Sequence, residues 1–201
     1  DDVESRGLGD VYKRQGYRRL TGKAPVSETL AAAILLLSPW NKDRILVDPF
    51  CGSGTFPIEA AMIGADIAPG MNREFTAESW TNLLPKKVWY DMINEAHDRI
   101  RGDVIMDIQG YDIDGEVIKA ARENAREAGV DHLIHLQQRP VSQLHHPKKY
   151  GFIITNPPYG ERLEEREALP SLYRQLGEGF SRLDSWSCFV LTSYDEAEKY
   201  M

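Results

Sequence analysis

The sequence predicts an open, mostly parallel α/β sheet with helices on both faces. Its 201 residues are enough for one domain with a sizeable core. Short runs of apolar residues alternate with longer segments in which apolar residues recur every three or four positions. Polar clusters follow two of the short runs directly, as ligand-binding residues do beyond the carboxyl ends of parallel strands. These observations together favour strands that alternate with crossover helices.

In the first half of the chain, helices and strands are expected to alternate around a glycine-rich loop. Ser27 can cap a helix over residues 29–37, which a proline follows. The apolar run 45–47 is typical of a parallel strand that is buried on both faces. A second helix is expected over 55–63 and, after a less regular stretch, an amphipathic helix over 86–101.

The second half continues the alternation. A helix that begins after Asp114 carries apolar residues at helical spacing and ends at Gly129. An apolar stripe from Leu169 to Leu183 indicates a further helix. Strands are expected over 108–112, 133–136, 152–155 and 188–191.

Composition and charge exclude several classes of protein. The longest apolar run, residues 30–37, is eight residues long, whereas a membrane span needs roughly 18, so no membrane partner is expected. The two cysteines have neither metal-binding nor disulfide spacing, which favours a cytoplasmic location. The net charge of −7 argues against non-specific coating of nucleic acid. A contact with nucleic acid or a partner is instead expected from residues 11–23, which hold no acid and five cations: Lys13, Arg14, Arg18, Arg19 and Lys23.

The first polar cluster, residues 48–55, joins a strand to a helix and has the features of a cofactor loop. Gly52 and Gly54 permit a close approach that a side chain would block, and the amides of the following helix face whatever binds there. A phosphate-binding loop would need Gly-Lys-Ser/Thr, and a nicotinamide loop would need a third glycine, but Pro57 and then Ile58 follow and neither is a glycine. A tight turn without a ligand is the remaining alternative.

An acidic residue ends each of the first two expected strands. Asp112 is placed to accept hydrogen bonds from the ribose hydroxyls of a nucleoside cofactor, or it is a turn residue before Asp114. Asp48 holds the loop or faces the cationic end of a sulfonium ligand.

The second polar cluster, Asn156-Pro157-Pro158-Tyr159, follows the fourth expected strand. The prolines remove two amide donors, so the Asn156 side chain and the Pro157 carbonyl can together accept two hydrogen bonds from one amine. Tyr159 can stack on a base. Because an exocyclic amine shares its lone pair with the ring, two acceptors would draw its nitrogen toward tetrahedral geometry and stabilise the charge that develops in methyl transfer. A plain turn at a strand end is the alternative.

With these residues the chain resembles the class I, Rossmann-like methyltransferases that modify amino groups of bases. More narrowly, it resembles the bacterial THUMP-domain-associated RNA methyltransferases, the family of the 23S ribosomal RNA guanine-N2-methyltransferases. The resemblance extends from about residue 13 to the C-terminus and rests, besides the two clusters, on the segments 16–18, 24–31, 67–73 and 159–163.

The resemblance implies an RNA (guanine-N2-)methyltransferase with S-adenosyl-L-methionine as its cofactor, an RNA substrate and no metal. Its catalytic residues would be Asn156, Pro157 and Tyr159. Residues 24–29 would border the methionine part of the cofactor, and Asp112 would bind its ribose. The implied cofactor-binding residues are Pro25, Ser27, Glu28, Thr29, Asp48, Pro49, Phe50, Cys51, Gly52, Ser53, Gly54, Thr55, Asp112, Ile113 and Asn156.

The chain also departs from the family pattern. Pro140 stands where such families usually carry an aspartate near the adenine. A THUMP module, which would supply RNA affinity, is expected N-terminal to this sequence, and the chain stops at Met201, before the closing hairpin strands of the fold. We therefore expect residues 1–15 to be linker or non-native sequence, and residues 16–201 to be a C-terminally truncated methyltransferase domain.

Other functions remain open. A DNA adenine-N6 methyltransferase would apply identical chemistry to another base, and a protein-glutamine methyltransferase faces the same chemical problem at an amide nitrogen. A non-catalytic RNA-binding or assembly module would keep the fold alone. His145 and His146 are expected in a surface loop without a metal, because no cysteine or carboxylate cluster accompanies them. Nothing near Cys51 indicates an activated thiolate.

Overall fold

The structure, a computed structural model, describes residues 17, 26–71, 74–160 and 163–201. Its centre is a five-stranded sheet in the order β3-β2-β1-β4-β5, in which every pairing is parallel. The predicted open parallel α/β fold is thus confirmed, and each strand boundary lies within two residues of its expected place. The strands are β1 (Leu46–Asp48), β2 (Ile108–Asp112), β3 (Ile134–Gln138), β4 (Phe152–Thr155) and β5 (Ser187–Val190).

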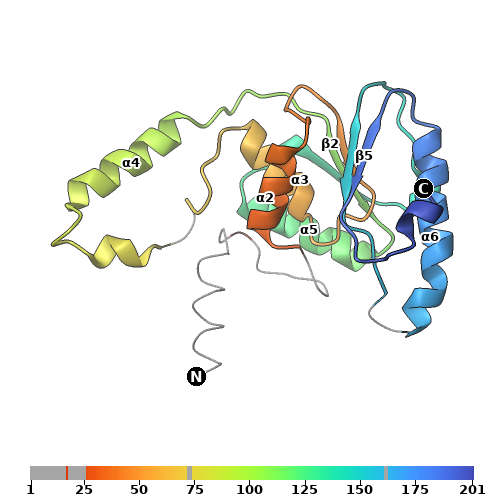
Figure 1. The fold of residues 1–201 in the computed structure, drawn as a ribbon. Coiled ribbons are helices and arrows are strands. Elements are labelled where there is room, and N and C mark those ends of the chain that lie inside the picture. Colours follow the sequence, from red (N-terminus) through yellow and green to blue (C-terminus); the bar gives the residue numbers. More distant parts are fainter. Residues whose placement is uncertain (1–16, 18–25, 72–73, 161–162) are drawn as a thin grey trace.

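Helices cover both faces of the sheet. The described α-helices are α2 (Glu28–Leu37), α3 (Thr55–Gly64), α4 (Lys86–Asp98), α5 (Gly115–Glu127) and α6 (Leu163–Ser181). Figure 1 shows α2, α3 and α5 on one face, α6 on the other, and α4 extended away from the body of the molecule. None of the described helices is long and apolar enough to cross a membrane. Three short 3-10 helices of the described residues lie between these elements, namely η1 (Thr76–Ser79), η2 (Asp131–Leu133) and η3 (Val141–Gln143), and η4 (Ala197–Lys199) follows β5.

Alternation along the strands gives the two faces separate cores. Leu46 and Ile108 belong to the core beneath α2, α3 and α5, whereas Val47 and Tyr111 belong to the core on the α6 side. Every residue of β1 is buried, which accounts for the uninterrupted apolar run at residues 45–47.

The helix ends follow from local hydrogen bonds. Ser27 caps α2 and Asp114 caps α5, each with a side-chain oxygen that accepts a backbone N–H. The amphipathic helix α4 is shorter than expected because the Arg101 amide donates to the Ala65 carbonyl, at 2.9 Å, instead of continuing the helix. The C-terminal end of α6 was also placed too late, because the helix ends at Ser181. Leu183 lies beyond this end and still packs in the core.

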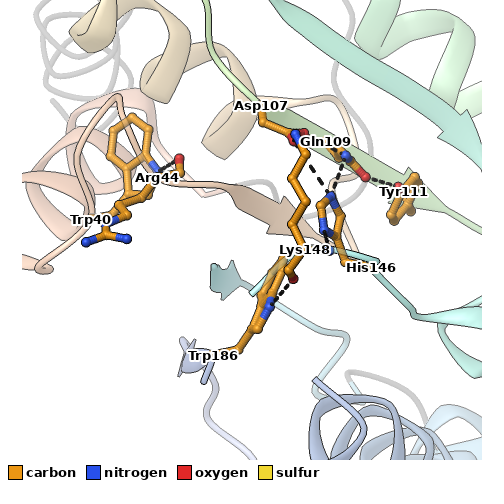
Figure 2. A network of polar contacts seen from close by, with 8 residues as sticks. All are labelled: Trp40, Arg44, Asp107, Gln109, Tyr111, His146, Lys148 and Trp186. Carbon is orange, nitrogen blue, oxygen red and sulfur yellow. Dashed lines mark hydrogen bonds and ion pairs between the residues drawn. The ribbon is translucent and has the colours of Figure 1, made fainter. Parts of the chain in front are cut away.

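The amino ends of the strands carry a network of polar contacts, drawn in Figure 2. The Lys148 amide donates to Nδ1 of His146 at 3.1 Å, and the Gln109 amide lies 3.1 Å from Nε2 of the same ring. Asp107 accepts hydrogen bonds from both Gln109, at 2.7 Å, and Lys148, at 2.8 Å. The expectation of a surface position is wrong for His146, whose side chain is only 4% exposed, because its ring fills the space beside the Trp186 ring.

Candidate active site

A cavity of about 750 Å³ opens at the carboxyl ends of β1, β2 and β4. Its wall combines the loop after β1, the end of β2, the loop after β4 and one side of α6. From β1 the strand order runs through β2 to β3 in one direction and through β4 to β5 in the other. Open parallel sheets bind their ligands at such a reversal point, and both polar clusters of the sequence meet here.

The loop after β1 is held against its neighbours by backbone contacts. The Cys51 amide donates to the Tyr111 carbonyl at 2.8 Å, which joins the loop to the end of β2. Gly54 adopts a φ of +89°, and a Cβ at this position would lie 3.2 Å from the Ala121 side chain. A glycine is therefore needed for the loop to turn into α3 while it packs on α5.

Asp48, the last residue of β1, connects the two polar clusters. Its Oδ1 accepts hydrogen bonds from the Phe50 amide at 3.1 Å and from the Thr155 hydroxyl at 2.5 Å. Burial raises the pKa of Asp48 to about 7 because the carboxylate loses hydration; the bonds from Thr155 and Phe50 oppose this shift, and the nearby Asp112 carboxylate adds to it. Oδ2 of Asp48 accepts no hydrogen bond from the described part of the chain.

Asp112, the last residue of β2, faces the same cavity in a fixed orientation. Its Oδ2 accepts a hydrogen bond from the Gly52 amide at 3.2 Å, and its Oδ1 accepts one from the Asp114 amide at 3.0 Å. Burial raises the pKa of Asp112, while these amides lower it. A carboxylate has about four acceptor sites in all, so Asp112 can accept further hydrogen bonds from a ligand hydroxyl.

The loop after β4 forms another part of the wall. Within the described residues, neither the Asn156 amide group nor the Tyr159 hydroxyl forms a hydrogen bond with the protein, and both residues line the cavity. The Tyr173 hydroxyl of α6 supports this loop, because it lies 3.4 Å from the Pro158 carbonyl and 2.5 Å from the Thr192 hydroxyl. The loop is therefore held by its backbone, and the polar groups of its side chains stay available.

The structure brings most of the expected site residues together. Of the expected set, Gly54 packs behind the wall, and Ser27, Glu28 and Thr29 do not line it; the Ser27 side chain is used to cap α2. Pro25 and the cations of segment 11–23 lie outside the described residues. The expected residues that line the cavity are Asp48, Pro49, Phe50, Cys51, Gly52, Ser53, Thr55, Asp112, Ile113, Asn156, Pro157 and Tyr159.

Sequence reasoning missed the contribution of α6. Five of its residues line the cavity along one side of the helix, where small and polar residues accompany the apolar stripe; that pattern was the available signal. These residues are Ala168, Leu169, Ser171, Leu172 and Gln175. Pro140 and Val141 also line the wall, so the place of the usual aspartate holds apolar groups.

The charge of the wall suits a cationic ligand. Its described residues include two carboxylates, Asp48 and Asp112, and no lysine, arginine or histidine. Such a cavity repels phosphate groups and attracts positive charge. S-adenosylmethionine fits this chemistry, since it joins a nucleoside to a sulfonium cation and has no phosphate. Ser53 fits as well, because its buried Oγ has no hydrogen-bond partner within the described residues.

Cys51 is an unreactive part of this wall. Burial raises the pKa of its thiol, and the carboxylates of Asp48 and Asp112 add to the shift. The raised pKa favours the protonated thiol, which agrees with the expectation that nothing near Cys51 activates a thiolate.

Several named proteins are similar in sequence to this chain. It is 44% identical over 197 residues to "Putative RNA methyltransferase YpsC" of Bacillus subtilis strain 168. The aligned residues are 98% of this chain and 50% of that protein. It is 45% identical over 193 residues to the ribosomal RNA large subunit methyltransferase K/L of Shewanella pealeana, across 92% of this chain and 27% of that protein. The chain thus spans half the length, or less, of these relatives.

Solved structures agree with the fold and with the expected cofactor. A predicted N6-adenine-specific DNA methylase from Listeria monocytogenes superposes with a TM-score of 0.89 at 48% identity, over 94% of this chain and 49% of that one. The protein described as "SMU.472, a putative methyltransferase complexed with SAH" superposes with a TM-score of 0.86 at 44% identity, over 93% of this chain and 48% of that one. Residues 15–201 match the family described as "RMKL-like, methyltransferase domain". The prediction of an S-adenosylmethionine-dependent methyltransferase fold is confirmed at this level, and the chain belongs to the family of RMKL-like methyltransferase domains.

Proposed function

We propose that this chain transfers a methyl group from S-adenosyl-L-methionine to the exocyclic amine of a base in RNA. The base that we propose is guanine, methylated at N2 in large-subunit ribosomal RNA. One observation carries the proposal: the Asn156–Tyr159 loop lines the same cavity as Gly52 and Asp112. The Bacillus relative named for RNA and the Shewanella relative named for large-subunit ribosomal RNA support the substrate.

In this proposal, the residues after β1 and β2 bind the cofactor, and the loop after β4 binds the target base. Bound S-adenosylmethionine supplies an electrophilic methyl group. Asp112, which the Gly52 and Asp114 amides orient, accepts hydrogen bonds from ribose hydroxyls. The apolar groups of Ile113 and Pro140 line the wall nearby and offer contacts to a flat adenine.

The loop after β4 prepares the amine. The Asn156 side-chain oxygen and the Pro157 carbonyl accept its two N–H groups, and Tyr159 stacks on the base. Two acceptors stabilise the positive charge that develops on the nitrogen, and a fixed approach geometry supplies much of the remaining rate. As the N–CH3 bond forms, the S–CH3 bond would break, and the cationic amine would then lose a proton to water, so no side chain has to act as a strong base.

We propose that the affinity for RNA comes from another part of a longer protein to which this chain belongs. The wall is acidic, and the relatives are about twice as long as the chain or longer. We propose that residues 16–201 act as the methyltransferase domain of a cytoplasmic protein in which a THUMP-type module binds the RNA.

A second candidate is methylation of adenine N6 in DNA, because the Listeria relative is named for it. The two are separated by incubating the protein and labelled S-adenosylmethionine with ribosomal RNA or with DNA, and then identifying the methylated nucleoside by mass spectrometry. N2-methylguanosine in RNA is the expected product. N6-methyladenine in DNA would give the function to the second candidate. Cofactor binding without any product would point to a non-catalytic module.

A further inference from the structure

We propose that the Asp48 carboxylate makes the cavity select the positively charged methyl donor over its neutral, demethylated product. This inference rests on the proposed function, in which S-adenosylmethionine is the donor and S-adenosylhomocysteine the product. The two molecules share the adenosine and the amino acid and differ in the sulfonium, which loses its methyl group and its positive charge together. A carboxylate beside the sulfur can distinguish them by this difference in charge.

The position of Asp48 is suited to that task. It is 1% exposed, yet it lines the cavity between the loop after β1 and the loop after β4. Both of its hydrogen bonds, from the Phe50 amide and the Thr155 hydroxyl, are accepted by Oδ1. Its Oδ2 accepts none within the described residues, which leaves one carboxylate oxygen available to a ligand.

Among the described residues, none beside Asp48 carries a positive charge that could neutralise it. The titratable groups beside it are the Asp112 carboxyl at the end of β2 and the Cys51 thiol in the loop, and the neighbouring Thr155 of β4 is neutral. The described wall has no lysine, arginine or histidine, so in this proposal the cation that pairs with Asp48 is the sulfonium of the ligand. A buried ionised carboxylate is costly unless it is paired, so the ligand's charge and the ionisation of Asp48 stabilise each other.

The consequence is a proton linked to donor binding. Burial raises the pKa of Asp48 to about 7, so about half of the free protein carries the proton at neutral pH. Binding of the sulfonium favours the ionised form and releases that proton, whereas binding of the neutral product does not. The donor is therefore bound more tightly as the pH rises through 7, and its preference over the product increases.

Titration calorimetry with S-adenosylmethionine and with S-adenosylhomocysteine, between pH 6 and pH 8, tests this inference. If only ionised Asp48 binds the donor well, the ratio of product Kd to donor Kd rises roughly tenfold across this range, as the ionised fraction does. In two buffers of different ionisation heat at pH 7, the donor should release about half a proton more than the product.

The variant Asp48→Asn provides the decisive comparison, because its Oδ1 can still accept both hydrogen bonds while the charge is lost. It should bind the product as well as the unchanged protein does, with a donor preference that no longer rises with pH. The ligands' own α-amino groups titrate near pH 8, and the variant's residual slope measures that contribution. Asp114→Asn, a matched control that keeps the α5 cap, should retain the pH-dependent preference.

The outcomes separate this inference from the proposed function. Equal pH dependence for donor and product, or a donor preference that survives in Asp48→Asn, would overturn the role of Asp48 and leave the methyltransferase proposal standing. Failure of the unchanged protein to bind either molecule would instead overturn the proposed function.

Discussion

The carboxyl edge and the amino edge of the sheet both gather polar side chains, but the two groups are satisfied differently. At the amino edge, Asp107, Gln109, His146 and Lys148 bond to one another (Figure 2). At the carboxyl edge, polar atoms face a cavity of about 750 Å³, and several of them find no partner within the described residues.

The difference distinguishes a structural network from a binding site. Buried polar groups that satisfy one another contribute to stability, whereas buried groups left without partners lower it and are retained where a ligand completes them. The pKa values follow the same division. Burial would raise the pKa of Asp107, but its hydrogen bonds with Lys148 and Gln109 hold that pKa below the ordinary value. At Asp48, by contrast, burial raises the pKa to about 7.

The largest expected effect is the loss of catalysis in Asn156→Ala. Removal of one of the two acceptors should lower kcat by about 100- to 1,000-fold, as removal of one stabilising group does in other enzymes. The affinity for S-adenosylhomocysteine should stay within about twofold of that of the unchanged protein. Single-turnover transfer to RNA, together with calorimetry, measures both quantities. Normal turnover would disprove the role of this loop.

Asp48→Asn should make the ligand-free protein more stable at neutral and alkaline pH. The folded pKa of Asp48, about 7, exceeds the ordinary aspartate value of about 3.9, so the native state binds the proton more tightly than the unfolded state. The protein with Asp48 therefore loses stability as the pH rises from about 4 to 7. Urea unfolding should show a gain in the variant that is absent near pH 4 and reaches at most about 4 kcal/mol at pH 8. A variant that is less stable at pH 8 would show that Asp48 is structural.

The opposite sign is expected at the amino edge. His146→Ala removes a ring that is 4% exposed, together with its contacts to Trp186 and Gln109, which should lower the free energy of unfolding by about 1–3 kcal/mol. The adjacent His145 is exposed, so His145→Ala should change stability by less than about 0.5 kcal/mol. Transfer per folded molecule should be unchanged in both variants, and a loss of transfer in His146→Ala would refute the division between the two edges.

Asp112→Ala should have the smallest of these effects. Loss of the carboxylate that Gly52 and Asp114 orient removes the proposed ribose acceptor, and the Kd for S-adenosylhomocysteine should rise at least tenfold, equivalent to about 1.4 kcal/mol. Calorimetry at a fixed pH measures the change. Unchanged affinity would show that the ribose binds elsewhere in the cavity.

The sequence predicted the sheet, and most of the residues that line the cavity at its carboxyl edge, because both depend on local patterns. Apolar runs of strand length and the glycines after β1 are visible without any tertiary information, and so is the Asn156 cluster. The contribution of α6 was missed because its lining residues have no chemical signature and acquire a role only when the helix packs beside the loop after β4. His146 was assigned to the surface because nothing in the sequence indicates that the distant Gln109 and Trp186 lie beside it.

Titration of this chain with S-adenosylhomocysteine, with ATP as the control, tests the central claim most directly. ATP carries the same adenosine but adds phosphates, which a wall with two carboxylates and no described cation should reject. The account predicts saturable binding of one S-adenosylhomocysteine per chain and no detectable binding of ATP. Absence of S-adenosylhomocysteine binding, or equal binding of ATP, would contradict the assignment of this cavity.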